Sequence, residues 1–160
     1  GIALGAFWDS GAVALCREAG QGARLPLRVG GKASRTGGLP VDLDVTVRAV
    51  AADHSQTGLS GARGAMGASA WVEADGVHLL LNSVRQQVFH PDAFEGLGLM
   101  LGDLRAVIVK SSQHFYAGFA PIAQQVRYVA TPGTFSATPG VSPYSKRMTP
   151  YWPLVENPFA

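Results

Sequence analysis

Runs of alternating hydrophobic and polar residues predict several β-strands along the chain. In residues 41–50, valine, leucine and alanine alternate with aspartate, threonine and arginine, as in a strand with one buried face. Residues 24–29 alternate in the same way over a shorter span. Residues 2–7 are a short apolar run of strand length, residues 105–109 are predicted to form a buried strand, and residues 126–129 are predicted to form another strand. Together these runs predict a β-sheet.

Glycines mark two connections between the predicted strands. Residues 69–74 and 77–82 flank Asp75-Gly76, a pair favoured in two-residue turns, which predicts a β-hairpin. In residues 57–68 a glycine recurs at every third position without the prolines of collagen. This segment is predicted to be a flexible loop. Because it lacks a P-loop lysine and a following helix, a mobile lid is favoured over phosphate binding.

Capping signals predict three helices. Asp9-Ser10 can cap a helix over about residues 11–18, which presents one apolar face. His90-Pro91-Asp92 is expected to begin a short helix, with proline at the first helical position and acid in the first turn. Ser111-Ser112 is expected to open a third helix that extends to about Gln125.

The order of these elements predicts an α/β fold, a single domain in which helices flank a mixed sheet. No domain boundary is expected within residues 1–160. The sequence after Thr131 is rich in proline, serine and threonine. Residues 131–160 are therefore expected to form an extended tail that packs on the domain through four aromatic side chains. These are Tyr144, Tyr151, Trp152 and Phe159.

Composition narrows the class of protein. Hydrophobic residues make up 47% of the 160 residues and charged residues 15%, which argues against intrinsic disorder. The net charge of +2 and the scattered basic residues give no reason to expect a nucleic-acid partner. No apolar stretch reaches the roughly 20 residues of a membrane-spanning helix. The single cysteine, Cys16, fits a reducing compartment, and we expect a cytoplasmic protein.

The first residues of the sequence raise the question of completeness. The chain has no initiator methionine and opens directly on an apolar run, with no signal-peptide pattern before it. We therefore expect the chain to be an excerpt from a longer protein.

Three polar clusters each follow the end of a predicted strand. They are residues 8–10 (WDS), 82–87 (NSVRQQ) and 110–114 (KSSQH). In α/β sheets, ligands gather beyond the carboxyl ends of parallel strands. If the three strands run parallel, the clusters lie along one edge, but the sequence does not determine their direction.

The third cluster carries the strongest signal. If Ser111 and Ser112 start a helix, their hydroxyl groups lie beside unpaired backbone N–H groups, which can cradle a carboxylate or phosphate, and Lys110 adds positive charge. His114 accompanies the serines and can face the ligand. The alternative is that the serines only cap the helix. A serine–histidine catalytic pair is disfavoured, because residues so close in sequence rarely align and no GxSxG motif occurs.

The other two clusters have competing interpretations. Arg85 offers a planar fork for a carboxylate, and Gln86 can orient an amide. Alternatively, Arg85 lies at a solvated strand end or pairs with Asp92 or Glu95. Asp9 is expected mainly to cap its helix.

The histidines give no sign of a metal site within this chain. His54, His78, His90 and His114 are widely separated, and neither HExxH, HxH nor a cysteine pair occurs. The first three are expected to be structural or solvated. We predict no metal ligands among these residues.

Five stretches, in the same order along the chain, carry a family resemblance. They are residues 5–9 (GAFWD), 22–32 (GARLPLRVGGK), 83–89 (SVRQQVF), 109–115 (VKSSQHF) with 119–121 (FAP), and 151–154 (YWPL). They resemble the C-terminal domain of the MlrC-type zinc metallopeptidases from about Leu4 to Leu154. KSSQHF is the most distinctive of them, and the glycine-rich stretch that usually leads into this domain is missing.

The resemblance implies a two-domain zinc peptidase that hydrolyses small or linearised peptides, the family's namesake acting on fragments of the toxin microcystin. The zinc ligands would belong to a preceding N-terminal domain, and this domain would close the substrate cleft. Arg85, Lys110, Ser111 and Ser112 would bind a substrate carboxylate, and His114 would contact the reacting region. A non-catalytic structural or oligomerisation domain and an anion-binding module remain alternatives, and a homo-oligomer stays open.

Overall fold

A computed structural model of the protein describes residues 1–33, 37–131, 146 and 149–159. The described residues form six strands and three helices. The strands are β1 (Ile2–Trp8), β2 (Arg24–Val29), β3 (Val41–Thr57), β4 (Arg63–Ala74), β5 (Val77–Asn82) and β6 (Ala106–Val109). The helices are α1 (Ser10–Ala19), α2 (Asp92–Glu95) and α3 (Tyr116–Phe119). None of the helices in these ranges has the length and hydrophobicity needed to cross a bilayer.

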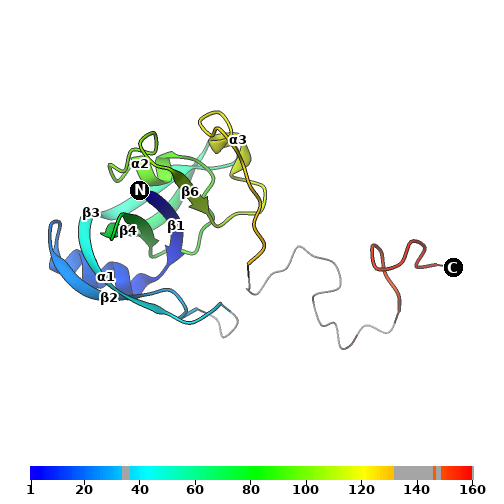
Figure 1. Ribbon diagram of the computed structural model, residues 1–160, viewed down its shortest axis with the longest axis horizontal. Helices are drawn as coiled ribbons and strands as arrows, with labels where there is room; N and C mark the ends of the chain where they lie inside the picture. Colours follow the sequence, from blue (N-terminus) through cyan, green and yellow to red (C-terminus); the bar gives the residue numbers. More distant parts are fainter. Residues whose placement is uncertain (34–36, 132–145, 147–148, 160) are drawn as a thin grey trace.

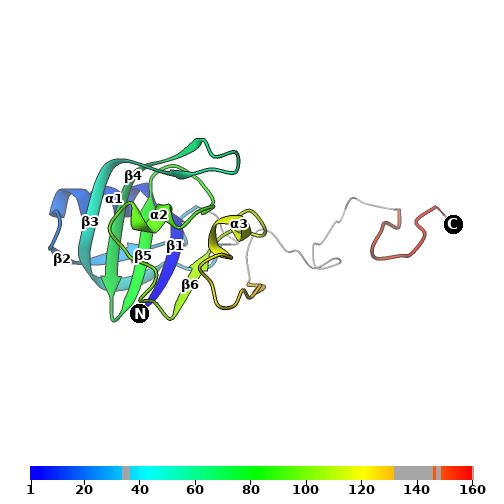
Figure 2. The same cartoon turned by 90° about the horizontal axis from the view of Figure 1, so that it is seen from above.

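All six strands belong to one mixed sheet in the order β2-β3-β4-β5-β1-β6. Neighbouring strands from β2 to β5 are antiparallel. β1 lies between β5 and β6 and is parallel to both (Figures 1 and 2). The expected α/β fold with a mixed sheet is confirmed.

A separate hydrophobic core lies on each face of the sheet. α1 packs against β2, β3, β4 and β5 on one face, where Val13 and Cys16 meet Leu81. α2 lies over the opposite face, where Phe94 packs with Leu80 and Val88. The alternation along β5, with Leu80 on one face and Leu81 on the other, follows from the two-residue period of a strand.

Several predicted elements are confirmed close to their expected bounds. α1 begins at Ser10 with Asp9 as its N-cap, as the capping signal indicates. The hairpin between β4 and β5 turns at Asp75 and Gly76, whose φ angles of 49° and 80° are the left-handed values that such turns require.

The prediction of a flexible loop over residues 57–68 is wrong. β3 continues to Thr57 and pairs with β4 from Arg63, so only a short turn separates the two strands. The backbone hydrogen bonds of this long ribbon outweigh the low strand propensity of glycine. Gly67 has a φ of +68°, and a Cβ there would lie 2.5 Å from Ser83 Oγ, so glycine allows close approach of the residues after β5. Because most of residues 57–68 belong to paired strands, the interpretation of this segment as a mobile lid is not supported.

Two predictions around residue 115 are also wrong. The helix expected from Ser111-Ser112 to Gln125 is reduced to α3, which begins only at Tyr116. It ends at Phe119, two residues before Pro121, whose nitrogen has no hydrogen to donate to a further helical bond. The strand expected at residues 126–129 is not formed, and Val126 instead packs against the core on the α2 face.

The predicted tail is only partly described. Tyr144 lies outside the described residues, and Trp152 and Phe159 are largely exposed. The packing of residues 131–160 on the domain stays a prediction.

Candidate functional site

The carboxyl ends of β5, β1 and β6 lie side by side at one edge of the sheet. The register pairs Trp8 with Asn82 and Gly5 with Val109, so the three parallel strands end close to one another. The sequence left open whether these three strands run parallel, and the structure shows that they do. We call the three clusters that follow these strands, residues 8–10, 82–87 and 110–114, the polar edge. Such edges are where α/β sheets place their ligands.

Asp9, at the end of β1, is a structural residue of the polar edge. Its buried carboxylate accepts a hydrogen bond from the backbone N–H of Ala12 at 3.1 Å, which confirms the capping role. It also accepts hydrogen bonds from the backbone N–H of Gly30 at 3.1 Å and from Lys32 Nζ at 2.7 Å. The two oxygens therefore join α1 to the residues that follow β2.

Asn82 fixes the turn that follows β5. Its side chain is fully buried, and its Nδ2 donates to the carbonyl of Val84. The Asn82 carbonyl accepts the backbone N–H of Asp9 at 3.0 Å, and the indole N–H of Trp8 donates to the carbonyl of Ser83 at 3.1 Å. These bonds tie the clusters after β5 and β1 together. Asn82 Oδ1 is buried and has no hydrogen-bond partner within the described residues.

Arg85 is an exposed cation that lies against an aromatic ring. The centre of its guanidinium group lies 5.9 Å from the centroid of the Trp8 ring, within the range of a cation–π interaction. The alternative of a salt bridge to Asp92 or Glu95 is not found. Asp92 instead pairs with Arg63 at 2.7 Å. Arg85 thus presents its charge to solvent at the polar edge.

Gln87 connects the cluster after β5 to the cluster after β6. Its Oε1 accepts a hydrogen bond from the Ser111 hydroxyl at 3.0 Å. Its backbone N–H donates to Oε1 of half-buried Gln86 at 3.0 Å. The two segments that carry most of the predicted site residues are therefore in direct contact.

The residues after β6 do not have the helical backbone conformation that was predicted for them. Lys110 is exposed, and its backbone N–H is bonded to the carbonyl of Gly5 at 3.0 Å. Ser111 N donates to the carbonyl of Val109 at 3.1 Å, and Ser112 is exposed. Since α3 begins four residues after Ser112, neither serine lies at a helix N-terminus. The prediction that Ser111 and Ser112 form a cradle of free helical N–H groups is therefore wrong. The two serines contribute their side-chain hydroxyl groups to this cluster.

His114 is exposed at the same edge. Its ring centroid lies 5.9 Å from that of Phe89, in a tilted arrangement. Phe89 belongs to the segment after β5, so this contact is a second link between the clusters after β5 and β6.

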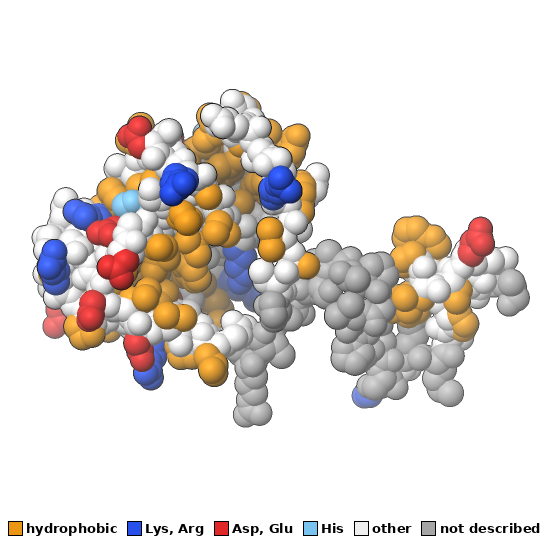
Figure 3. All heavy atoms as spheres, in the orientation of Figure 1, with side chains coloured by type: hydrophobic (Ala, Val, Ile, Leu, Met, Phe, Trp, Pro, Cys, Tyr) orange, Lys and Arg blue, Asp and Glu red, His pale blue; other side chains and the backbone are white. Residues whose placement is uncertain are grey.

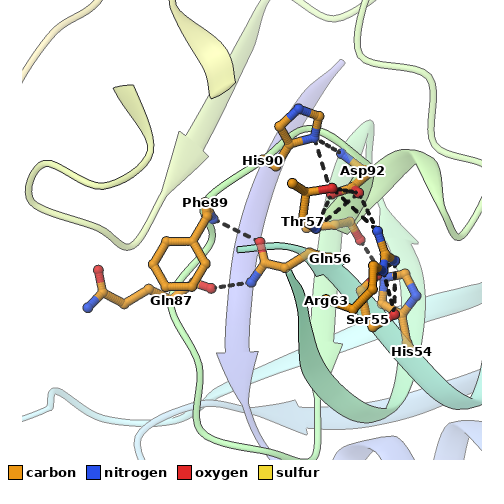
Figure 4. A network of polar contacts seen from close by, with 10 residues as sticks. His54, Ser55, Gln56, Thr57, Arg63, Gln87, Phe89, His90 and Asp92 are labelled. Carbon is orange, nitrogen blue, oxygen red and sulfur yellow. Dashed lines mark hydrogen bonds and ion pairs between the residues drawn. The ribbon is translucent and has the colours of Figure 1, made fainter. Parts of the chain in front are cut away.

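A buried glutamine, which the sequence did not single out, holds the segment after Arg85. Gln56 on β3 is fully buried, its Nε2 donates to the carbonyl of Gln87, and its Oε1 accepts the backbone N–H of Phe89 at 2.8 Å (Figure 4). The residue was missed because the predicted strand ended at residue 50 and the predicted loop began at residue 57, so position 56 was assigned to no element. The sequence of residues 51–57, AADHSQT, does not alternate between hydrophobic and polar residues, so no local signal marks this end of β3.

Asp92 anchors the far end of the same segment to the β3–β4 ribbon (Figure 4). Its carboxylate accepts hydrogen bonds from Thr57 N at 3.0 Å, Thr57 Oγ1 at 2.7 Å and Arg63 Nη1 at 2.7 Å. Partial burial raises the pKa of Asp92, but these hydrogen bonds outweigh it, so its pKa lies below the usual value. Asp92 is thus held as a carboxylate, and Gln56 and Asp92 together fix the chain beyond Arg85.

The residues that could bind a metal are dispersed. Within the described ranges, no group of three or more histidine, cysteine, aspartate or glutamate side chains is placed to hold a metal ion. His54 is buried with its Nε2 2.8 Å from the carbonyl of Ala93, and His78 Nδ1 accepts the indole N–H of Trp71 at 3.1 Å. The donor set of these residues does not fit a zinc site by itself.

Comparison with known proteins agrees with this architecture. Residues 1–146 match the family model described as "MlrC C-terminus". The chain is 36% identical over 151 residues to Microcystinase C from Sphingomonas sp, a match that covers 94% of this chain and 29% of that protein. A protein from Mesorhizobium sp. BNC1, whose crystal structure is described as that of a candidate metallopeptidase, is also similar. It superposes with a TM-score of 0.79 at 29% identity, over 96% of this chain and 31% of that one.

The chain thus spans about three-tenths of the length of these relatives. The family match, the similar fold and the polar stretches of the sequence agree with one another. The chain belongs to the MlrC C-terminal domain family.

Proposed function

We propose that this chain is the substrate-facing domain of a zinc-dependent peptidase that acts on small or linearised peptides. The observation that carries the proposal is the polar edge, where three parallel strands end together and present Arg85 and Lys110 to solvent. The name Microcystinase C and the description of the Mesorhizobium protein as a metallopeptidase support peptide hydrolysis as the reaction.

In this proposal the polar edge binds the carboxylate of a peptide. Arg85 forms paired hydrogen bonds to both carboxylate oxygens, because its guanidinium is a planar fork, and the Trp8 ring orients it. Lys110 adds a second positive charge. The hydroxyl group of Ser112 and the amide of Gln86 bind the neighbouring peptide group.

Ser111 and His114 take the remaining roles. Ser111 keeps the clusters after β5 and β6 together through its bond to Gln87 and can offer its hydroxyl oxygen to a substrate N–H. His114 hydrogen-bonds the substrate close to the bond that is cleaved. Its imidazole can donate or accept a proton near neutral pH, which suits a group beside the reacting atoms.

The zinc ion is assigned to another part of the protein. The described residues do not supply its ligands, and the relatives are about three times as long as this chain. We propose that an N-terminal domain holds the metal and that the full-length protein acts in the cytoplasm. A zinc ion there would supply an activated water; the residues of this chain bind and orient the substrate.

Steady-state kinetics of the full-length protein with a linear peptide test the proposal. Arg85→Ala, Lys110→Ala and His114→Ala are each expected to lower kcat/KM by about tenfold or more, equivalent to about 1.4 kcal/mol of transition-state stabilisation. Arg17→Ala is the matched control, because Arg17 is an exposed arginine in the last turn of α1. Unchanged kinetics in all three variants would remove the substrate site from this domain. A change in Tm alone would indicate a structural domain, and anion binding without any hydrolysis would indicate a binding module.

A further inference from the structure

Along the parallel strands, the residues that the structure describes leave one face of the sheet largely uncovered. Cα partners across parallel strands place their side chains on the same face, so the register aligns two rows. Ile2 lies between Val77 and Ala106, and Leu4 lies between Leu79 and Ile108. Leu4, Val77 and Leu79 belong to the core beneath α1, so both rows face the α1 side of the sheet. We call Ile2, Leu4, Ala106 and Ile108 the β1–β6 face.

Exposure rises steadily across these rows from β5 towards β6. Leu79 is 5% exposed, Leu4 is half-buried and Ile108 is 54% exposed. In the other row Val77 is half-buried, Ile2 is 36% exposed and Ala106 is exposed. The reason is that α1 packs over β2 to β5 and leaves the end of the sheet open. Figure 3 shows hydrophobic side chains gathered over the region of β1 and β6.

The sequence of β6 is that of a strand covered on both faces. Its four residues, AVIV, are all apolar, without the polar alternation of a strand that faces water on one side. The opposite face of β6 is covered, since Val107 and Val109 pack against the core that includes α2. Sheets made of parallel strands are almost always covered on both faces, and β5, β1 and β6 form the parallel part of this mixed sheet. The apolar sequence of β6 therefore predicts a partner for the β1–β6 face that the described part of the chain does not supply.

We infer that the β1–β6 face is the docking surface for the part of the full-length protein that lies outside this chain. The relatives supply the occupant, because about seven-tenths of each lies outside the matched segment. The same strands end at the polar edge, so a domain packed on this face would lie next to Arg85 and Lys110. This inference deepens the proposed function, since it names the surface that joins the two domains.

Cysteine labelling of the full-length protein tests the inference. Ile108→Cys and Ile2→Cys place thiols on the β1–β6 face, and Leu59→Cys places one in the β3–β4 turn, where Leu59 is 63% exposed. Reaction rates with a polyethylene glycol maleimide are measured for each variant under native conditions. Buried Cys16 gives the baseline of a folded protein, because it should remain unlabelled.

We expect the thiols at positions 108 and 2 to react at least about tenfold more slowly than the thiol at position 59. Equal rates at the three positions would overturn the inference. Protection that weakens on dilution, or that is lost when residues 132–160 are deleted, would also overturn it, because a second copy or the C-terminal residues of this chain would then cover the face. Peptidase activity measured on the same samples separates the two ideas. Equal labelling with normal sensitivity to Arg85→Ala would refute the docking surface and leave the proposed function intact.

Discussion

Replacement of Gln56 tests how the polar edge is held in place. Gln56→Met retains most of the side-chain volume and removes the polar end that bonds to the carbonyl of Gln87 and the N–H of Phe89. Because Gln56 is fully buried, no water can take over the position of its amide without rearrangement.

The expected loss of stability follows from these two hydrogen bonds. A buried backbone group that loses its partner costs about 1–3 kcal/mol. Gln87 is exposed and Phe89 half-buried, so water can reach part of this segment and the lower end of the range applies. At about 1 kcal/mol for each of the two backbone groups, we expect Gln56→Met to lower the free energy of unfolding by about 2 kcal/mol. Gln56→Ala should lower it further, because it also leaves a cavity.

Urea denaturation followed by tryptophan fluorescence measures this effect. Gln124→Met is the matched control, because Gln124 is exposed, and it should shift the free energy of unfolding by less than about 0.5 kcal/mol. Gln56→Met should also raise KM for the peptide, because the segment that carries Arg85 becomes less ordered. A loss below about 0.5 kcal/mol for Gln56→Met, with normal KM, would refute the positioning role.

Three further predictions concern other parts of the fold. Asp9→Ala should lower the free energy of unfolding by about 2 kcal/mol in urea denaturation, because the α1 cap and the contact with Lys32 are both lost; a neutral effect would contradict this. The pKa of Asp92 is lowered on folding, so its ionised form stabilises the protein above the unfolded pKa of about 3.9 and this contribution is lost as the pH falls through the folded value. The stability difference between wild type and Asp92→Asn should therefore shrink in urea titrations below about pH 4, and a constant difference would argue against the network. Burial, aided by the Asp9 carboxylate, raises the pKa of Cys16 to about 11, so this thiol should react with a disulfide reagent only as the protein unfolds; labelling within the mixing time would contradict its burial.

Local patterns in the sequence were sufficient to predict much of the fold. The alternation of hydrophobic and polar residues predicted a strand with the same bounds as β2. The Asp75-Gly76 pair predicted the hairpin between β4 and β5. In both cases the signal lies within a few neighbouring residues. The extent of β3 and β4 was not predicted, because glycines at positions 58, 61, 64 and 67 suggest a loop, while pairing between two long strands depends on contacts that no local pattern contains.

The candidate site was predictable in its parts and not in its assembly. Each polar cluster could be recognised because it follows a strand, but the parallel direction of β5, β1 and β6 is a property of the whole sheet. Serine capping of a helix at Ser111 was a reasonable local inference that tertiary packing overrode. The hydrogen bonds of Gln56 join segments more than thirty residues apart, as the separations of 31 and 33 residues show. Such long-range bonds leave no periodic trace in a sequence.

The most direct test of the central claim compares two peptides that differ only at the C-terminus. One ends in a free carboxylate and the other in an amide, and kcat/KM is measured for full-length wild type, Arg85→Ala and Arg85→Lys. If the polar edge binds a substrate carboxylate, wild type prefers the free acid, and Arg85→Ala reduces that preference by about tenfold. Arg85→Lys should recover part of it, because the charge is retained without the planar fork. An equal loss of activity towards both peptides would contradict carboxylate recognition by Arg85.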